Sequence, residues 1–142
     1  MEINGIPLHP LVVHAAVVFG PVAALVSLIH STSAKWRVRL QVPAVLLAIV
    51  ASGAIFAAWF TGRNFLSSRP ELKQLALVHT HQHRANILAL VTIGYVVLAI
   101  AAWVTRAQPA GRIARVLLAV ASIAVIGLVV AVGDAGARAV WS

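Results

Sequence analysis

The chain has 142 residues, of which 61% are hydrophobic and 10% charged, and its mean hydropathy is +0.97. Soluble domains carry roughly 25% charged residues, so this composition excludes a soluble protein and predicts an integral membrane protein. The formal charge of +8 comes from basic residues grouped between apolar segments. In those places they contact anionic lipid headgroups, which argues against nucleic acid as a partner.

Cysteine is absent from the chain, and only three residues are acidic. The chain therefore cannot form a disulfide or supply thiolate ligands to an iron–sulphur cluster. No Ser-His-Asp, paired-carboxylate or phosphate-loop pattern appears either, so we expect no catalysis by this chain alone. A metal ion would have to be held by nitrogen and oxygen ligands.

Four apolar segments are long enough to span a bilayer, which requires about 20 helical residues. They lie at about 10–30, 40–60, 83–104 and 113–133, with boundaries uncertain by a few residues. The first five residues lack the basic region and cleavage site of a signal peptide, so the first segment is expected to be retained. The sequence predicts one all-α domain over residues 1–142, an integral membrane four-helix up-down bundle.

The first segment begins at Pro10 and contains Pro21, which is expected to kink it. Small residues recur on one face of this segment at Ala16, Gly20 and Ala24, which allows helices to approach closely in lipid. The last segment is expected to end at the glycine-rich stretch 133–136. The four tryptophans fall at predicted helix ends, where they are expected to anchor the helices at the membrane interface: Trp36, Trp59, Trp103 and Trp141.

The first and third loops carry basic residues and no acids, whereas the other side of the membrane carries five basic residues together with all three acids. The basic residues of the two loops are Lys35, Arg37, Arg39, Arg106, Arg112 and Arg115. This bias favours a cytoplasmic position for both loops. The termini and the histidine-rich loop are then extracytoplasmic in a bacterial plasma membrane.

The densest polar stretch is 78–86, where three alternate histidines precede an arginine and an asparagine. At about 100° per residue, His79, His83 and Asn86 form one stripe of a helix and His81 points nearly the opposite way. The spacing predicts that the stripe, rather than His81, faces the interior of the bundle.

Up-down alternation brings this stretch to the same end of the bundle as His9 and His14. His14 lies just over one turn beyond Pro10 and is expected to reach the bundle interior, whereas His9 lies nearer the surface and to one side. Polar groups inside a membrane usually face a partner or a cavity. We therefore expect His14 and His83 to be the main functional residues.

Three kinds of site would use these residues. Haem b could take His14 and His83 as axial iron ligands, with a propionate bound by Arg84 or Arg63. A quinone could instead bind a histidine and a nearby arginine or carboxylate. A zinc or copper ion could be held by His79 and His83, with His9 or His14 completing the ligand set.

The two helical hairpins show a faint internal symmetry. In each hairpin, histidines are followed by an apolar helix, a tryptophan with a basic loop, a second apolar helix, and then glycine and arginine. The first hairpin runs from His9 to Arg63 and the second from His79 to Arg138. A parallel duplication would place the first and third helices in equivalent positions, both presenting histidine to a shared axis.

Four features of the chain are shared with a known family: the stretch from Gly5 to His14, a second helix with Trp59, a third helix with His83 and Asn86, and a glycine-rich C-terminal stretch. In these features the chain resembles the bacterial four-helix membrane family known as domain of unknown function 2231. The resemblance covers nearly the whole chain. Members often carry Phe-Pro after the second histidine, where this chain has Ala-Ala. Some relatives are joined to a Rieske-type iron–sulphur domain, which implies exchange with electron carriers.

Two functions follow from these observations. The first is a membrane electron-transfer or anchor subunit of a respiratory, quinone-linked oxidoreductase, with haem b or quinone bound by histidines of the first and third helices. Its flavin or iron–sulphur centres would lie on partner subunits. The second is a stand-alone structural or metal-handling membrane protein that uses its histidine-rich end as an interaction surface.

Overall fold

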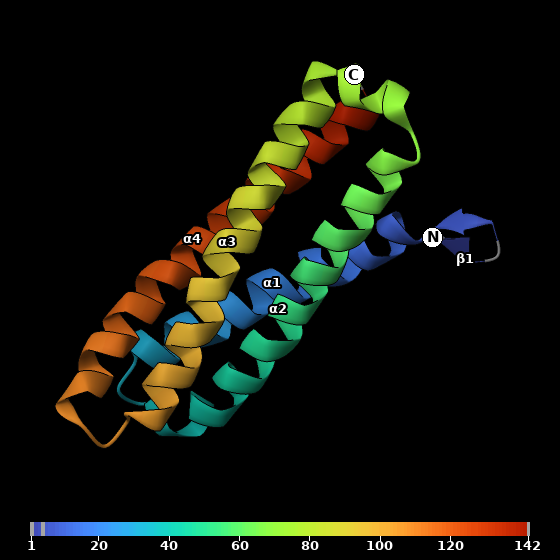
Figure 1. Ribbon diagram of the computed structural model, residues 1–142. Helices are drawn as coiled ribbons and strands as arrows, with labels where there is room; N and C mark the ends of the chain where they lie inside the picture. The colour runs from blue at the N-terminus through green and yellow to red at the C-terminus, as the bar shows by residue number, and fades with distance from the viewer. Residues whose placement is uncertain (1, 4, 142) are drawn as a thin grey trace.

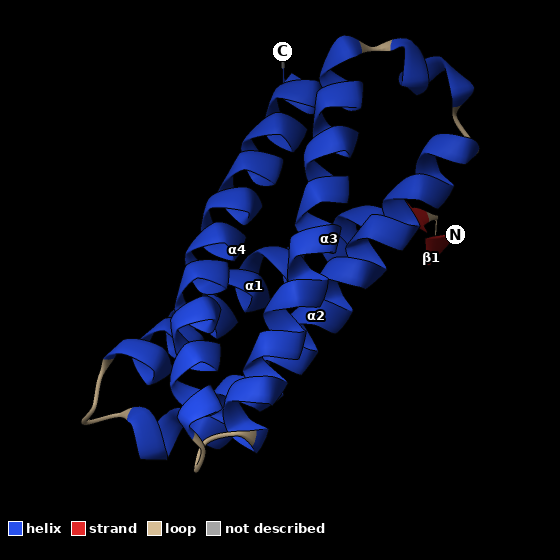
Figure 2. Ribbon diagram, turned by 60° about the vertical axis from the view of Figure 1, so that its left-hand side comes forward, coloured by secondary structure: helices blue, strands red, loops and turns tan. Residues whose placement is uncertain are grey.

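The protein is a bundle of four long helices, seen in a computed structural model that describes residues 2–3 and 5–141, with side chains from residue 5 onward. The helices are α1 (Leu8–Thr32), α2 (Arg37–Ser67), α3 (Ala76–Val104) and α4 (Pro109–Trp141), and consecutive helices run in opposite directions (Figure 1). A short hairpin of β1 (Glu2–Ile3) and β2 (Ile6–Pro7) precedes α1, and a 3-10 helix, η1 (Pro70–Gln74), joins α2 to α3. Figure 2 shows how little of the chain is not helical. The predicted all-α four-helix bundle is confirmed.

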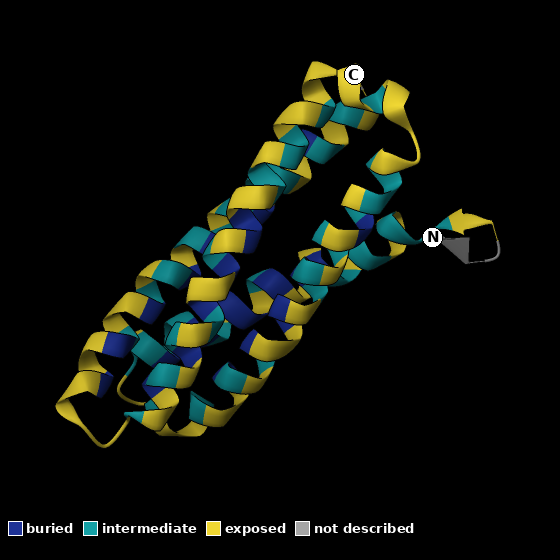
Figure 3. Ribbon diagram, viewed as in Figure 1, coloured by how far each residue is buried: buried dark blue, intermediate teal, exposed yellow. Residues whose placement is uncertain are grey.

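Each of the four helices is long enough and apolar enough to cross a membrane. Their outward faces carry large apolar side chains such as Val38, Leu90 and Ile123, and the buried residues lie on the inward faces (Figure 3). An apolar outer surface on every helix is the arrangement that lipid tails require. The chain is a multi-pass membrane protein.

The helices extend beyond their predicted ends. α3 begins at Ala76 rather than near residue 83, α2 continues past Trp59 to Ser67, and α4 passes through the glycine-rich stretch to Trp141. In α4 an ion pair between Nε of Arg138 and Oδ2 of Asp134, one turn apart and 3.0 Å from each other, supports the helix beyond the apolar region. The apolar segments mark only the part of each helix that lies in hydrocarbon, so they underestimate the helix length.

The small residues of α1 pack inside the bundle, as predicted. Ala16, Gly20 and Ala24 are buried, and a Cβ atom placed on Gly20 would lie 3.2 Å from a methyl group of Val129. The glycine therefore permits α1 to approach α4 closely. In lipid this close packing, rather than the hydrophobic effect, holds helices together.

The buried positions of the second hairpin repeat those of the first at a fixed separation along the chain. Five buried positions of α2 recur in α4 at one constant separation: Ala44/Leu118, Ala48/Ser122, Ala51/Val125, Ile55/Val129 and Thr61/Ala135. Five buried positions of α1 recur in α3, again at one constant separation: Ala16/Leu88, Gly20/Thr92, Ala23/Tyr95, Ser27/Ala99 and His30/Ala102. The helix contacts follow the same pattern, since α1 packs most on α2 and α3 most on α4, while α1 also contacts α4 and α2 contacts α3. The two hairpins are thus related by an approximate two-fold axis along the bundle.

Near the middle of the bundle, Tyr95 is fully buried, with 0% of its surface exposed. Its hydroxyl group shares a hydrogen bond of 2.8 Å with the hydroxyl of Ser27. The residue equivalent to Tyr95 in the first hairpin is Ala23, so only one large ring occupies this layer. The hydrogen bond joins the two hairpins across the core.

The Ser27→Ala variant is expected to lower the free energy of unfolding by about 1–3 kcal/mol, because the Tyr95 hydroxyl would be buried without its partner. The double variant Ser27→Ala/Tyr95→Phe should be closer to the wild type, since it removes both partners. Reversible unfolding in mixed detergent micelles measures both. A double variant less stable than Ser27→Ala would show that the hydrogen bond is not the cause.

Candidate functional site

A cavity of about 190 Å³ lies between the helices at the end of the bundle that carries the histidines. All four helices contribute to its wall. The lining residues are His9, Val13, Ala16 and Val17 of α1, Ile55, Ala58 and Trp59 of α2, His81, Ala85 and Leu88 of α3, and Val129, Val132, Gly133, Gly136 and Ala137 of α4. Apart from the two imidazoles and the indole, the side chains of this wall are aliphatic. The cavity therefore combines a water-excluding wall with two groups that can exchange protons.

His9 reaches the cavity from the first turn of α1. Its Nδ1 lies 3.3 Å from Oγ1 of Thr61 in α2. The Thr61 hydroxyl donates its own proton to the carbonyl oxygens of Ala57 (2.8 Å) and Ala58 (3.1 Å). The hydroxyl oxygen must therefore accept from His9, which places the His9 proton on Nδ1 and leaves a lone pair on Nε2.

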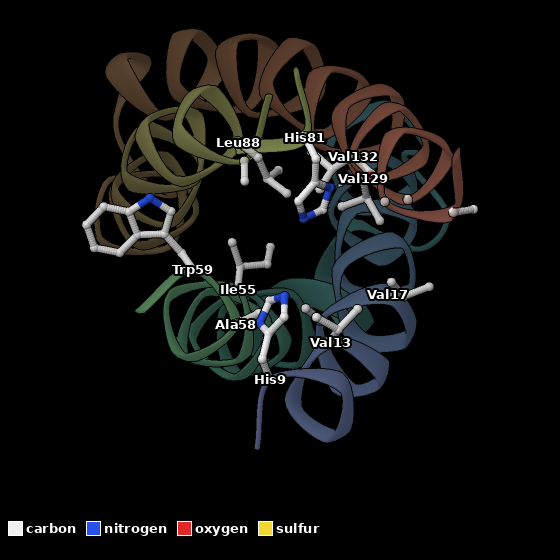
Figure 4. A pocket seen from close by; sticks show the side chains of 15 residues that line it. His9, Val13, Val17, Ile55, Ala58, Trp59, His81, Leu88, Val129 and Val132 are labelled. Atoms are coloured by element: carbon white, nitrogen blue, oxygen red, sulfur yellow. Dashed lines mark hydrogen bonds between the residues drawn. The ribbon is translucent and has the colours of Figure 1, made fainter. Parts of the chain in front are cut away.

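His81 reaches the cavity from α3, opposite His9 (Figure 4). Its Nδ1 lies 3.1 Å from the carbonyl oxygen of Val132 in α4. A carbonyl can only accept, so Nδ1 carries the proton, and in the neutral imidazole Nε2 again keeps the lone pair. A backbone or hydroxyl acceptor on Nδ1 is the arrangement that fixes an imidazole whose Nε2 serves a ligand.

A glycine lies against each of these imidazole rings. A Cβ atom on Gly62 would lie 2.9 Å from Cε1 of His9, and one on Gly136 would lie 3.1 Å from Cε1 of His81. Such contacts are too short for an unperturbed ring. The glycines of α2 and α4 therefore leave the space in which the two histidines lie.

The structure corrects the predicted orientation of the histidines. His14, expected in the interior, is exposed on the surface of α1 and donates from Nδ1 to the carbonyl oxygen of Pro10 at 2.6 Å. His79 and His83 are likewise exposed on α3 and do not line the cavity, whereas His81, expected to point away, does. The cavity histidines are thus His9 and His81.

The physical reason is the rotation of α3 about its axis. The inward face of α3 follows Leu88, Thr92 and Tyr95, which are buried. Continued towards the start of the helix at the same spacing, this face reaches Ala85 and His81 rather than His83. The lipid-facing side chains of α3 are also apolar, so this spacing by itself did not identify His81 in the sequence.

The other two predicted residues join helices rather than line the cavity. Asn86 accepts a hydrogen bond through Oδ1 from Nε1 of Trp59 at 2.7 Å, which links α3 to α2. Arg84 donates from Nη1 to the carbonyl oxygen of Ala131 at 3.0 Å and lies 4.0 Å from the carboxylate of Asp134, which links α3 to α4. Neither residue lines the cavity, although Trp59 does.

A protein family described as "Predicted membrane protein (DUF2231)" matches residues 5–142. The chain belongs to this family. The match includes both hairpins, and with them both cavity histidines. No curated protein and no solved structure matches the chain significantly.

The residues predicted to hold zinc or copper do not come together. His79 and His83 lie on the outside of α3, while His9 faces the cavity. Within residues 5–141, whose side chains the structure describes, no three His, Asp or Glu side chains are grouped so that they could hold a metal ion. The cavity offers two imidazole nitrogens and no carboxylate.

The Asn86→Ala variant is expected to lower the free energy of unfolding by about 1 kcal/mol, the usual net contribution of one hydrogen bond. The matched control is His83→Ala, three residues earlier, whose exposed side chain forms no hydrogen bond that the structure records; its effect should be within about 0.5 kcal/mol. Unfolding in mixed micelles distinguishes the two. Equal stabilities would show that the contact with Trp59 contributes nothing.

Proposed function

We propose that this chain is a membrane electron-transfer or anchor subunit of a respiratory oxidoreductase in the bacterial plasma membrane, and that its cavity binds the headgroup of a quinone. One observation carries the proposal: two imidazoles, each with a free Nε2, enter an apolar cavity from opposite sides. The apolar wall suits a quinone ring, and the two nitrogens can accept hydrogen bonds from the hydroxyl groups of its reduced form, the quinol.

The size of the cavity favours a quinone over haem b. An apolar cavity of about 150 Å³ holds a benzene molecule, so 190 Å³ suits a single substituted six-membered ring. Pockets that enclose drug-sized molecules measure about 300–1,000 Å³, and a porphyrin belongs to that class. The histidines expected as axial ligands, His14 and His83, also face away from the cavity. These observations favour a quinone over haem b.

A bound quinone would supply redox chemistry in which two electrons and two protons are exchanged. The contribution of this chain would be to bind, orient and protonate. The Nε2 atoms of His9 and His81 can accept hydrogen bonds from quinol hydroxyl groups, and imidazoles gain and lose protons near neutral pH. Because the chain has no cysteine, an iron–sulphur centre that exchanges the electrons would belong to a partner subunit.

The orientation follows the distribution of basic residues. The two loops that connect α1 to α2 and α3 to α4 lie at the end of the bundle away from the cavity. With these basic loops in the cytoplasm, the cavity opens on the extracytoplasmic side. Quinone would then exchange its protons with that side of the membrane.

Trp59 provides a direct test, because its indole lines the cavity. A short-chain 1,4-quinone titrated into the protein in lipid nanodiscs should quench part of the tryptophan fluorescence in a saturable manner. The Trp59→Phe variant should lose the saturable component, while Trp103→Phe, altered at the opposite end of the bundle, should keep it. Identical quenching in both variants would contradict binding in the cavity.

Two further observations separate the proposal from its alternatives. Purification from native membranes in mild detergent should recover a flavin or iron–sulphur protein with this chain, whereas recovery of the chain alone would favour a stand-alone structural role. A visible spectrum of a haem-replete preparation should show no Soret band. A stoichiometric Soret band would favour haem b.

A further inference from the structure

We infer that the cavity consists of two equivalent half-sites, one from each helical hairpin, and that it binds a 1,4-quinone in its reduced, quinol form, with one hydroxyl group donating to Nε2 of His9 and the other to Nε2 of His81. This inference rests on the proposed function, since it specifies how the quinone is held. Its basis is the approximate two-fold relation between the hairpins.

The residues that form the site are related between the two hairpins by the same separations along the chain as the buried core residues. The separation along the chain between His9 and His81 is the one that relates the buried positions of α1 to those of α3. The separation between Gly62 and Gly136 is the one that relates the buried positions of α2 to those of α4. Each histidine therefore packs against the glycine of its own hairpin in the same way.

The hydrogen bonds are equivalent as well. His81 donates directly to the carbonyl oxygen of Val132. His9 reaches the carbonyl oxygen of Ala58 through the Thr61 hydroxyl, and Ala58 and Val132 are themselves equivalent positions of α2 and α4. In both hairpins the Nδ1 proton is directed to the second helix of the same hairpin, which leaves both Nε2 atoms for a ligand.

Two like groups related by a two-fold axis suit a ligand that has two like ends. A 1,4-quinol carries its two hydroxyl groups at opposite ends of a flat apolar ring. In a 1,2-quinol the hydroxyl groups are adjacent on one side of the ring, so they match imidazoles on opposite sides of the cavity less well than the hydroxyl groups of a 1,4-quinol do. The aliphatic side chains between the histidines, including Ile55, Leu88 and Val129, then contact the ring itself.

The test compares single histidine variants of the full chain in nanodiscs, with the saturable quenching of Trp59 by a short-chain 1,4-quinol as the readout. His9→Leu and His81→Leu are each expected to weaken binding about tenfold, the effect of one lost hydrogen bond. His14→Leu and His83→Leu are the matched controls and should bind as the wild type does. Circular dichroism and gel filtration check that each variant is folded.

The second part of the test uses a ligand with only one hydroxyl group. The corresponding monohydroxy phenol can use only one imidazole at a time, so either single variant should retain nearly all of its wild-type affinity for the phenol. The variant without both histidines should bind neither ligand tightly.

The outcomes separate the inference from the proposed function. If the wild type binds the 1,4-quinol but only one of the two variants weakens binding, or if a 1,2-quinol binds equally well, the two-fold site is wrong and the quinone site stands. If the wild type shows no saturable binding of the quinol or its quinone, the proposed function itself is wrong.

Discussion

Replacing Tyr95 with alanine is expected to lower the free energy of unfolding by about 3 kcal/mol, the largest loss of stability from a single change in the core. Deleting a large buried ring costs about 3–5 kcal/mol in soluble proteins. In a membrane the lower end applies, because lipid tails solvate an apolar side chain as well as the core does and only the packing and the cavity terms remain. Tyr95 is fully buried and bonded to Ser27, so both contributions are lost.

Leu90 is the matched control for this change. It lies on the same helix with 70% of its surface exposed, so Leu90→Ala should cost within about 0.5 kcal/mol, as surface substitutions do. Reversible unfolding in mixed micelles measures both variants. If Tyr95→Ala were as mild as Leu90→Ala, the two hairpins would not be packed around Tyr95.

The largest expected effect on ligand binding comes from the glycines beside the histidines. Gly62→Val and Gly136→Val should each weaken quinol binding by at least about tenfold, because the displaced ring loses the hydrogen bond that orients it. A Cβ atom alone would lie 2.9 Å from the His9 ring and 3.1 Å from the His81 ring, and valine adds two methyl groups to that contact.

Gly127→Val controls for the cost of placing valine in a helix. Gly127 also lies within α4, but a Cβ atom there would meet nothing within 4 Å. The affinity of the Gly127→Val variant for the quinol, measured by the quenching of Trp59, should equal that of the wild type. Equal binding by Gly136→Val and Gly127→Val would contradict the close packing of His81 against α4.

The sequence was sufficient to predict the number of helices, their order and the end at which the histidines gather. These features follow from the bilayer, which requires long apolar helices. Within such helices every backbone polar group is hydrogen-bonded to another group of the same helix. Up-down alternation then places the first turn of α1 and the first turns of α3 at one end. The helix ends were less predictable, because the backbone hydrogen bonds of each helix continue past the apolar segment into the polar residues beside it, as they do near Ala76 and Asp134.

The rotation of each helix about its axis could not be read from hydrophobic periodicity. Lipid-facing and buried positions are both apolar in this chain, so the usual contrast between the two faces is absent. The stripe of His79, His83 and Asn86 is as regular as the inward stripe through His81, so periodicity alone does not distinguish the two. Comparing the two hairpins would have resolved the ambiguity, because the separation that relates the cores of α1 and α3 also pairs His9 with His81.

The most direct test of the site is cysteine cross-linking, which the absence of native cysteine makes unambiguous. His9→Cys/His81→Cys in the full chain should be joined within one molecule by a short phenylene bismaleimide, as read by mass spectrometry of the intact protein. His14→Cys/His83→Cys should take up separate reagent molecules without a cross-link. Cross-linking of the second pair and not the first would show that the outward histidines form the shared site and would contradict this account.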